Sequence, residues 1–76
     1  MKNKQRVMLI TGAAGGIGKS TVQLFFEKGW IVIGVDRNIF GENFPENGLY
    51  IQADISDPNN LEKIYDSVRN FTDSLD

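Results

Sequence analysis

The apolar residues of this chain fall into three nearly continuous runs, each followed by a turn or a polar segment. The runs occupy residues 7–11, 31–36 and 49–53. Apolar runs of this length are typical of parallel strands that are covered on both faces. We therefore predict a parallel sheet of these three strands, with the strand at 7–11 central and buried on both faces.

Helical periodicity follows the first and the third run, where apolar residues recur every three or four positions. The first helix is expected to end at Gly29 in a left-handed C-cap, and the second to begin with Asp57 as N-cap and Pro58 in its first position. We expect the second helix to run to about residue 71 or 73. The predicted buried stripes comprise Ile17, Thr21, Val22, Leu24, Phe25 and Phe26 in the first helix and Leu61, Ile64, Tyr65 and Val68 in the second.

The segment 37–48 is polar with scattered aromatic residues and shows no helical stripe, so we predict a loop. The element order is then β-α-β-loop-β-α, with right-handed crossovers. This order predicts an α/β fold with a parallel sheet. With 76 residues, the chain is one small domain at most. Tyr50, at the start of the third strand, is expected to have a packing role rather than a catalytic one.

A glycine-rich turn, residues 11–18 (Thr-Gly-Ala-Ala-Gly-Gly-Ile-Gly), links the first strand to the first helix. Bare backbone N–H groups and the positive end of a helix dipole together favour a bound phosphate. Gly12 allows the tight turn, Gly16 lets the backbone approach a pyrophosphate, and Gly18 lets the helix lie close to the sheet. The turn therefore predicts a nucleotide-binding site.

Two other interpretations fit the same turn. Residues 13–20 have the shape of a P-loop ATPase motif, with Lys19 and Ser20 where the phosphates and magnesium would be bound. A glycine-rich turn can also be purely structural and bind nothing. Asp36 favours a dinucleotide, because it ends the second strand 18 residues after Gly18, where an acid binds the ribose hydroxyls of adenosine.

With Thr11 in front, the turn closely resembles the Thr-Gly-x-x-x-Gly-x-Gly cofactor fingerprint of the short-chain dehydrogenase/reductase family. The resemblance implies a Rossmann-type doubly wound parallel sheet, of which residues 1–76 form the N-terminal, dinucleotide-binding half-domain. It also implies a nicotinamide cofactor and hydride transfer to or from an alcohol or carbonyl substrate. It also implies that Asp54, after the third strand, accepts the adenine amino group and that Ile55 contacts the ring. The cofactor-binding residues predicted in this way are Thr11, Gly12, Gly16, Ile17, Gly18, Asp36, Arg37, Asp54 and Ile55.

The carboxylate of Asp36 also bears on which nicotinamide cofactor is preferred. It would repel the 2′-phosphate of NADP and accept hydrogen bonds from the free hydroxyls of NAD. Arg37 and Lys19 could partly offset that repulsion, and Arg37 could instead stack on the adenine or be solvated. We therefore predict NAD as the cofactor, with NADP less favoured.

The composition argues against several other classes of function. A net charge of −2 and a pI near 4.9 are unlike a nucleic-acid-binding surface. The sequence has no cysteine and no histidine, which leaves no disulfide or thiolate metal site and fits a cytoplasmic setting. The N-terminal segment is too weakly apolar for a signal peptide or a membrane span. We predict no metal, nucleic-acid or membrane partner.

The resemblance covers this whole chain but only the N-terminal part of a family member. The family's catalytic serine and its Tyr-x-x-x-Lys pair would lie beyond Asp76, and Tyr65 with Arg69 does not replace them. We therefore expect a fragment of a longer, homo-oligomeric enzyme, without catalytic residues and inactive alone. The short link between Asp36 and Asp54 resembles that of 2,3-dihydro-2,3-dihydroxybenzoate dehydrogenases.

Overall fold

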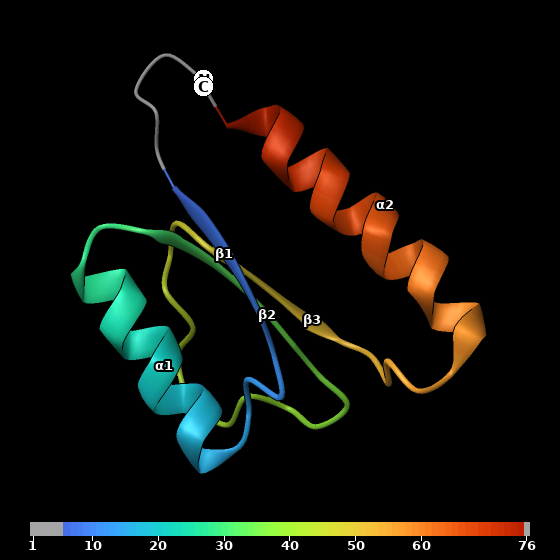
Figure 1. Cartoon of the computed structure of the whole chain (residues 1–76), viewed down its shortest axis with the longest axis horizontal. Helices are drawn as coiled ribbons and strands as arrows, with labels where there is room; N and C mark the ends of the chain where they lie inside the picture. Colours follow the sequence, from blue (N-terminus) through green and yellow to red (C-terminus); the bar gives the residue numbers. More distant parts are fainter. Residues whose placement is uncertain (1–5, 76) are drawn as a thin grey trace.

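The chain folds as a three-stranded parallel sheet with one helix on each face (Figure 1). A computed structural model describes residues 6–75. The strands lie in the order β1-β2-β3, and the predicted α/β class, element order and parallel pairing are confirmed. The elements are β1 (Val7–Thr11), α1 (Gly16–Glu27), β2 (Ile31–Asp36), β3 (Leu49–Gln52) and α2 (Pro58–Ser74).

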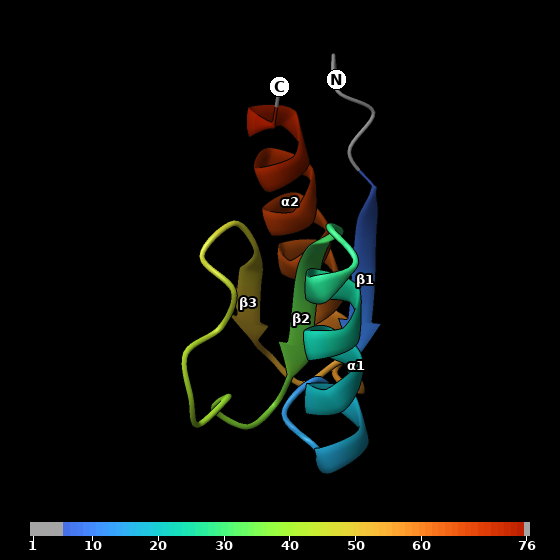
Figure 2. The same cartoon turned by 90° about the vertical axis from the view of Figure 1, so that its left-hand side faces the viewer.

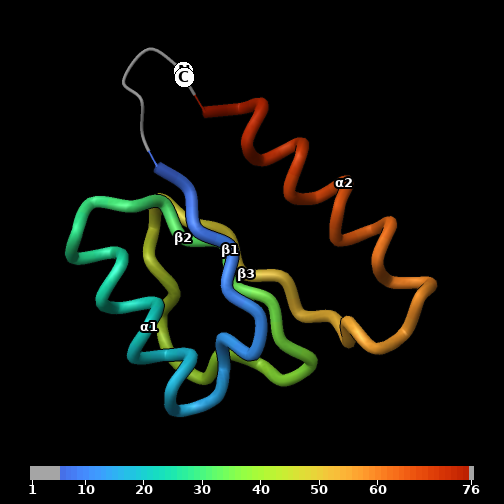
Figure 3. The backbone as a smooth tube through the Cα atoms, in the orientation of Figure 1, coloured from blue at the N-terminus to red at the C-terminus, as the bar shows by residue number. Residues whose placement is uncertain are grey.

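The register of the sheet brings the carboxyl ends of all three strands to one edge. Thr11 of β1 pairs with Val35 of β2, and Asp36 pairs with Gln52 of β3. Figure 3 shows that the backbone leaves all three strands at the same end of the sheet. The third strand ends one residue earlier than predicted, although the Ala53 N–H still donates to the Asp36 carbonyl at 2.9 Å. The turn after β1 and the segments after β2 and β3 are therefore neighbours.

One face of the sheet is covered jointly by α1 and the loop 37–48 (Figure 2). The predicted loop is confirmed, and its side chains Phe40 and Phe44 pack into the core on this face. The rings of Phe40, Phe44 and Tyr50 lie 5.0–5.5 Å apart, centre to centre. Burial raises the pKa of the Tyr50 hydroxyl, which donates to the Asn38 carbonyl. The predicted packing role of Tyr50 is confirmed, and the cluster fixes the loop on the sheet.

The prediction that β1 is central and buried on both faces is wrong for this chain. β2 is the central strand, and Ile31 to Val35 are all buried. β1 is an edge of the described sheet, where Leu9 is 49% exposed. Within residues 6–75 no further strand pairs with the free edge of β1, and the main contacts of α2 are with β3, so Leu9 is left about half-exposed.

The predicted helix stripes are also only partly correct. In α1, Val22 is buried and Thr21 and Phe25 are half-buried, whereas Ile17 is 87% exposed because it lies in the first turn of the helix, where nothing covers it. In α2, Ile64 is the buried residue, and the main contacts of the helix with the sheet are at β3. The predicted stripe residues that are exposed are Ile17, Leu24 and Phe26 in α1 and Leu61 and Tyr65 in α2.

The ends of the two helices follow the predicted caps. The Asp57 carboxylate accepts from the Asn59 N–H at 3.0 Å, and Pro58 is the first residue of α2, which ends at Ser74. Gly29 follows α1 with φ +88°, and its N–H donates to the Phe26 carbonyl at 3.0 Å. Within residues 6–75, neither helix is long and apolar enough to cross a bilayer.

Candidate nucleotide-binding site

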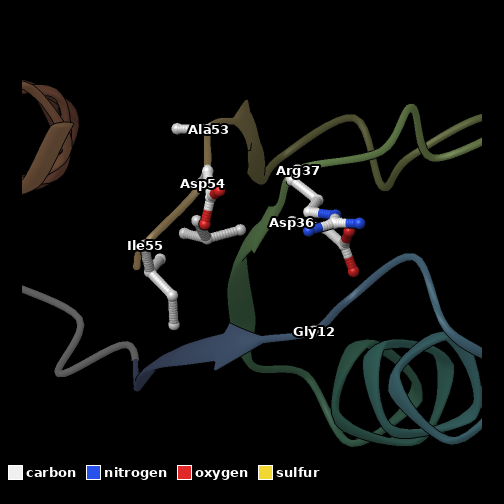
Figure 4. Close-up of a pocket in the computed structure, with 7 residues that line it drawn as sticks. Gly12, Asp36, Arg37, Ala53, Asp54 and Ile55 are labelled. Atoms are coloured by element: carbon white, nitrogen blue, oxygen red, sulfur yellow. The ribbon is translucent and has the colours of Figure 1, made fainter. Parts of the chain in front are cut away.

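An open hollow of about 190 Å³ lies at the carboxyl ends of the strands (Figure 4). Three separate segments meet there: the turn after β1, the end of β2 and the segment after β3. Ligands of open parallel sheets bind at this end of the strands, so the position is the one expected for a nucleotide. The residues that line the hollow are Gly12, Val35, Asp36, Arg37, Ala53, Asp54 and Ile55.

Asp36, the last residue of β2, joins two of these segments. One carboxylate oxygen accepts from the Ala14 N–H in the glycine-rich turn at 3.0 Å, and the other accepts from the Asn38 N–H at 2.9 Å. The Asn38 N–H is the main reason why the pKa of the Asp36 carboxyl lies below its usual value. Asp36 is therefore an ionised hydrogen-bond acceptor, and its bond to Ala14 connects the glycine-rich turn to the end of β2.

The glycine-rich turn is shaped by close backbone contacts. Gly12 has φ +69°, in the left-handed region that favours glycine. A Cβ at Gly18 would lie 2.0 Å from the Gly12 carbonyl oxygen, so α1 starts directly against the turn. We predicted a close approach of Gly18 to the sheet, and the close approach is to the turn instead. A Cβ at Gly16 would meet no heavy atom within 4 Å, which leaves open space beside the backbone there.

Asp54 and Ile55 form the wall of the hollow that follows β3, and Figure 4 shows both side chains beside the end of β2. One oxygen of Asp54 accepts from both the hydroxyl and the N–H of Ser56, which lowers the pKa of the Asp54 carboxyl. The side chain of Arg37 is exposed, and Figure 4 shows its guanidinium group beside the Asp36 carboxylate. The hollow thus combines two carboxylates and one cation with the apolar side chains of Val35, Ala53 and Ile55.

The structure brings most of the predicted site residues together. Gly12, Asp36, Arg37, Asp54 and Ile55 line the hollow. The others do not line it: Thr11 ends β1, and Gly16, Ile17 and Gly18 form the first turn of α1 beside it. Which of these residues contact a ligand stays a prediction.

Sequence inspection missed several groups at the site. Val35 and Ala53 line the hollow, and Ala14 supplies a backbone donor to Asp36. No side-chain signal marks a backbone donor, so Ala14 could not have been identified. Ser56 could have been, because a hydroxyl two residues after an aspartate often bonds to it. Within the described residues, no three acidic side chains lie close enough together to hold a metal ion.

The side chain of Lys19, which a P-loop would direct to bound phosphates, has other partners in this structure. Its ammonium group is 3.7 Å from the Glu42 carboxylate and 5.3 Å from the centre of the Phe40 ring. Both partners belong to the loop 37–48, so the side chain is engaged with that loop rather than with the turn that precedes α1. The geometry does not favour the P-loop interpretation.

Known proteins with similar sequences include a dehydrogenase. The NAD-dependent glycerol dehydrogenase of Listeria innocua is 33% identical over 93% of this chain and 30% of the relative. The protein FixR of Bradyrhizobium diazoefficiens is 38% identical over 90% of this chain and 26% of the relative. This chain therefore spans less than a third of the length of these relatives.

A solved structure with the same fold carries a nicotinamide cofactor. The short chain dehydrogenase of Leptospira borgpetersenii with bound NAD+ superposes with a TM-score of 0.80 at 27% identity, over 91% of this chain and 28% of that chain. None of the proteins named here is a dihydrodihydroxybenzoate dehydrogenase, so that narrower resemblance is unsupported. Residues 6–76 match the family model described as short chain dehydrogenase, and the chain belongs to the short-chain dehydrogenase family.

Proposed function

We propose that this chain is the NAD(H)-binding part of a dehydrogenase that transfers a hydride between the nicotinamide cofactor and an alcohol or carbonyl substrate. The observation that carries the proposal is the Asp36 carboxylate, which is fastened to the glycine-rich turn and faces a hollow shared with Asp54. This arrangement joins the elements that would hold the phosphates, the ribose and the adenine of one dinucleotide.

The start of α1 fits a pyrophosphate. The N-cap is Gly15, which offers no side-chain hydrogen bond, and the first turn contains no acidic residue. The first backbone N–H groups of a helix have no partner within the helix, and they bind anions well. The open space at Gly16 lets a phosphate approach these groups, and Gly12 is open in the same way.

Asp36 fits an adenosine ribose with two free hydroxyl groups. Each carboxylate oxygen has about two lone-pair sites, and each already accepts one backbone N–H. Within residues 6–75, these two hydrogen bonds leave further lone-pair capacity on the carboxylate, which suits the hydroxyl donors of the NAD ribose. A 2′-phosphate would instead place a second negative charge beside Asp36, so NAD is preferred over NADP.

The relatives support the same cofactor. The Listeria relative is named as NAD-dependent, and the Leptospira structure holds NAD+. Because those proteins are more than three times as long as this chain, we assign substrate binding and proton transfer to the rest of the parent protein. This chain by itself, residues 1–76, is then inactive, and its nicotinamide-binding role depends on the longer protein.

Calorimetry on the protein expressed from its own gene tests the proposal. NAD+, NADP+ and ATP with magnesium are titrated separately into the wild type and into the Lys19→Ala variant. We expect NAD+ to bind most tightly, with an affinity that Lys19→Ala leaves nearly unchanged. Tight ATP binding that Lys19→Ala abolishes would support the P-loop alternative, and no binding of any nucleotide would support a structural module.

Several finer points stay predictions. These are the cytoplasmic setting, the homo-oligomer and the lack of nucleic-acid or membrane partners. Sedimentation of the purified protein tests the oligomer directly, and a monomer would contradict that prediction.

A further inference from the structure

Asp54 is held by hydrogen bonds to only one of its two carboxylate oxygens. That oxygen accepts from the Ser56 hydroxyl at 2.7 Å and from the Ser56 N–H at 2.9 Å. Within residues 6–75, no hydrogen bond reaches the second oxygen. Asp54 lines the hollow, so one oxygen serves to orient the group while the other stays available there.

The main chain of Asp54 is fixed as well. Its carbonyl oxygen accepts from the Asn60 side-chain amide at 3.1 Å and from the Asp57 N–H at 3.2 Å. Both donors belong to the start of α2, so the helix holds the backbone of Asp54 in place. The remaining freedom of the side chain is its rotation, and the two donors of Ser56 restrict that rotation.

The chemistry of the group suits a hydrogen-bond donor in the ligand. The hydroxyl of Ser56 is the main cause of the lowered pKa of Asp54, so the carboxyl group is ionised and can only accept. The adenine ring carries an exocyclic amino group, which donates. An acceptor held in one orientation loses less rotational freedom on binding than a mobile one.

We propose that Ser56 is a positioning residue for adenine recognition, since it turns the second oxygen of Asp54 toward the 6-amino group. This inference rests on the proposed NAD-binding function. It assigns Ser56 a role in base selectivity, without contact between Ser56 and the cofactor. A serine that merely caps the turn before α2 would have no such effect on selectivity.

The test compares NAD+ with nicotinamide hypoxanthine dinucleotide, in which an oxygen replaces the amino group. Calorimetry on the protein expressed from its own gene gives the affinity ratio of the two dinucleotides for the wild type and for Ser56→Ala, Ser56→Thr and Asp54→Asn. We expect Ser56→Ala to reduce the preference for NAD+ about three- to tenfold, the scale of one hydrogen bond. Ser56→Thr keeps the hydroxyl and the preference. Ser67→Ala, an exposed serine on α2, is the matched control and changes nothing.

A double-mutant cycle separates positioning from general stability. In the Asp54→Asn background, Ser56→Ala should produce no further loss of preference. The inference is wrong if Ser56→Ala leaves the affinity ratio of the two dinucleotides unchanged or weakens the binding of both equally. In either case, NAD+ binding by the wild type would still support the proposed function. Absence of NAD+ binding by the folded wild type would instead refute the proposed function.

Discussion

Replacement by alanine should have different effects at two glycines of the glycine-rich turn: Gly18→Ala should lower the stability of the fold, and Gly16→Ala should lower the affinity for NAD+. A Cβ at Gly18 would lie 2.0 Å from the Gly12 carbonyl oxygen and 2.8 Å from the Cα of Ala13. Both neighbours are backbone atoms, so the turn or the helix must move. Overpacking of this kind costs about 3 kcal/mol at the upper end of its usual range. Alanine regains about 1 kcal/mol over glycine inside a helix, which leaves a net loss of about 2 kcal/mol.

Gly16 offers the matched control. Its added Cβ meets no heavy atom within 4 Å, and the residue lies in the same helix, so Gly16→Ala should fold at least as stably as the wild type. The methyl group would nevertheless occupy the space that we assign to the pyrophosphate. We expect the affinity for NAD+ to fall at least about tenfold, or about 1.4 kcal/mol.

Urea unfolding and calorimetry with NAD+ measure the two effects on the protein expressed from its own gene. Gly18→Ala should lower the free energy of unfolding, and Gly16→Ala should lower the affinity alone. Unchanged stability of Gly18→Ala would refute the close approach of α1 to the turn. Wild-type affinity of a folded Gly16→Ala variant would refute the phosphate site at the start of this helix.

Further predictions concern the carboxylates and activity. Asp36→Ala should reduce the discrimination against NADP+ about tenfold by calorimetry, and an unchanged ratio would exclude Asp36 from ribose recognition. The pKa of the Asp36 carboxyl is lowered in the folded protein, so the ionised carboxylate stabilises the fold above its ordinary pKa of 3.8. That contribution is lost as the pH falls through the lower pKa of the folded state. Plots of unfolding free energy against pH for the wild type and for Asp36→Asn should therefore converge only in acid. Asp57→Ala should destabilise by about 1 kcal/mol in urea, whereas Asp73→Ala, at the other end of α2, should not. The isolated chain should show no NAD-linked alcohol oxidation, and turnover by it alone would contradict our assignment of catalysis to the rest of the protein.

The strands and the helix caps could be predicted from the sequence because they depend on local chemistry. Continuous apolar residues marked Ile31 to Asp36 as a strand, and Asp57 followed by proline marked the start of α2. The turn chemistry at Gly12 and Gly29 also follows from the conformations that these positions need.

The burial of single side chains could not be predicted, because it depends on where the elements meet. An amphipathic pattern does not show which part of the sheet a helix covers, so the predicted burial of Leu61 and Tyr65 on α2 is wrong. The link between Asp36 and the Ala14 N–H is equally hidden, since it joins residues 22 positions apart through a backbone donor. The site was predictable at the level of residue types and not at the level of its hydrogen bonds.

A crystal structure of the protein with NAD+ bound tests the central claim most directly. We expect the adenosine ribose to lie in the hollow between Gly12, Asp36 and Asp54, with its hydroxyl oxygens about 2.5–3.0 Å from the Asp36 carboxylate. The pyrophosphate should lie at the start of α1. A dinucleotide whose adenosine lies outside this hollow, with no ribose contact to Asp36, would contradict the account.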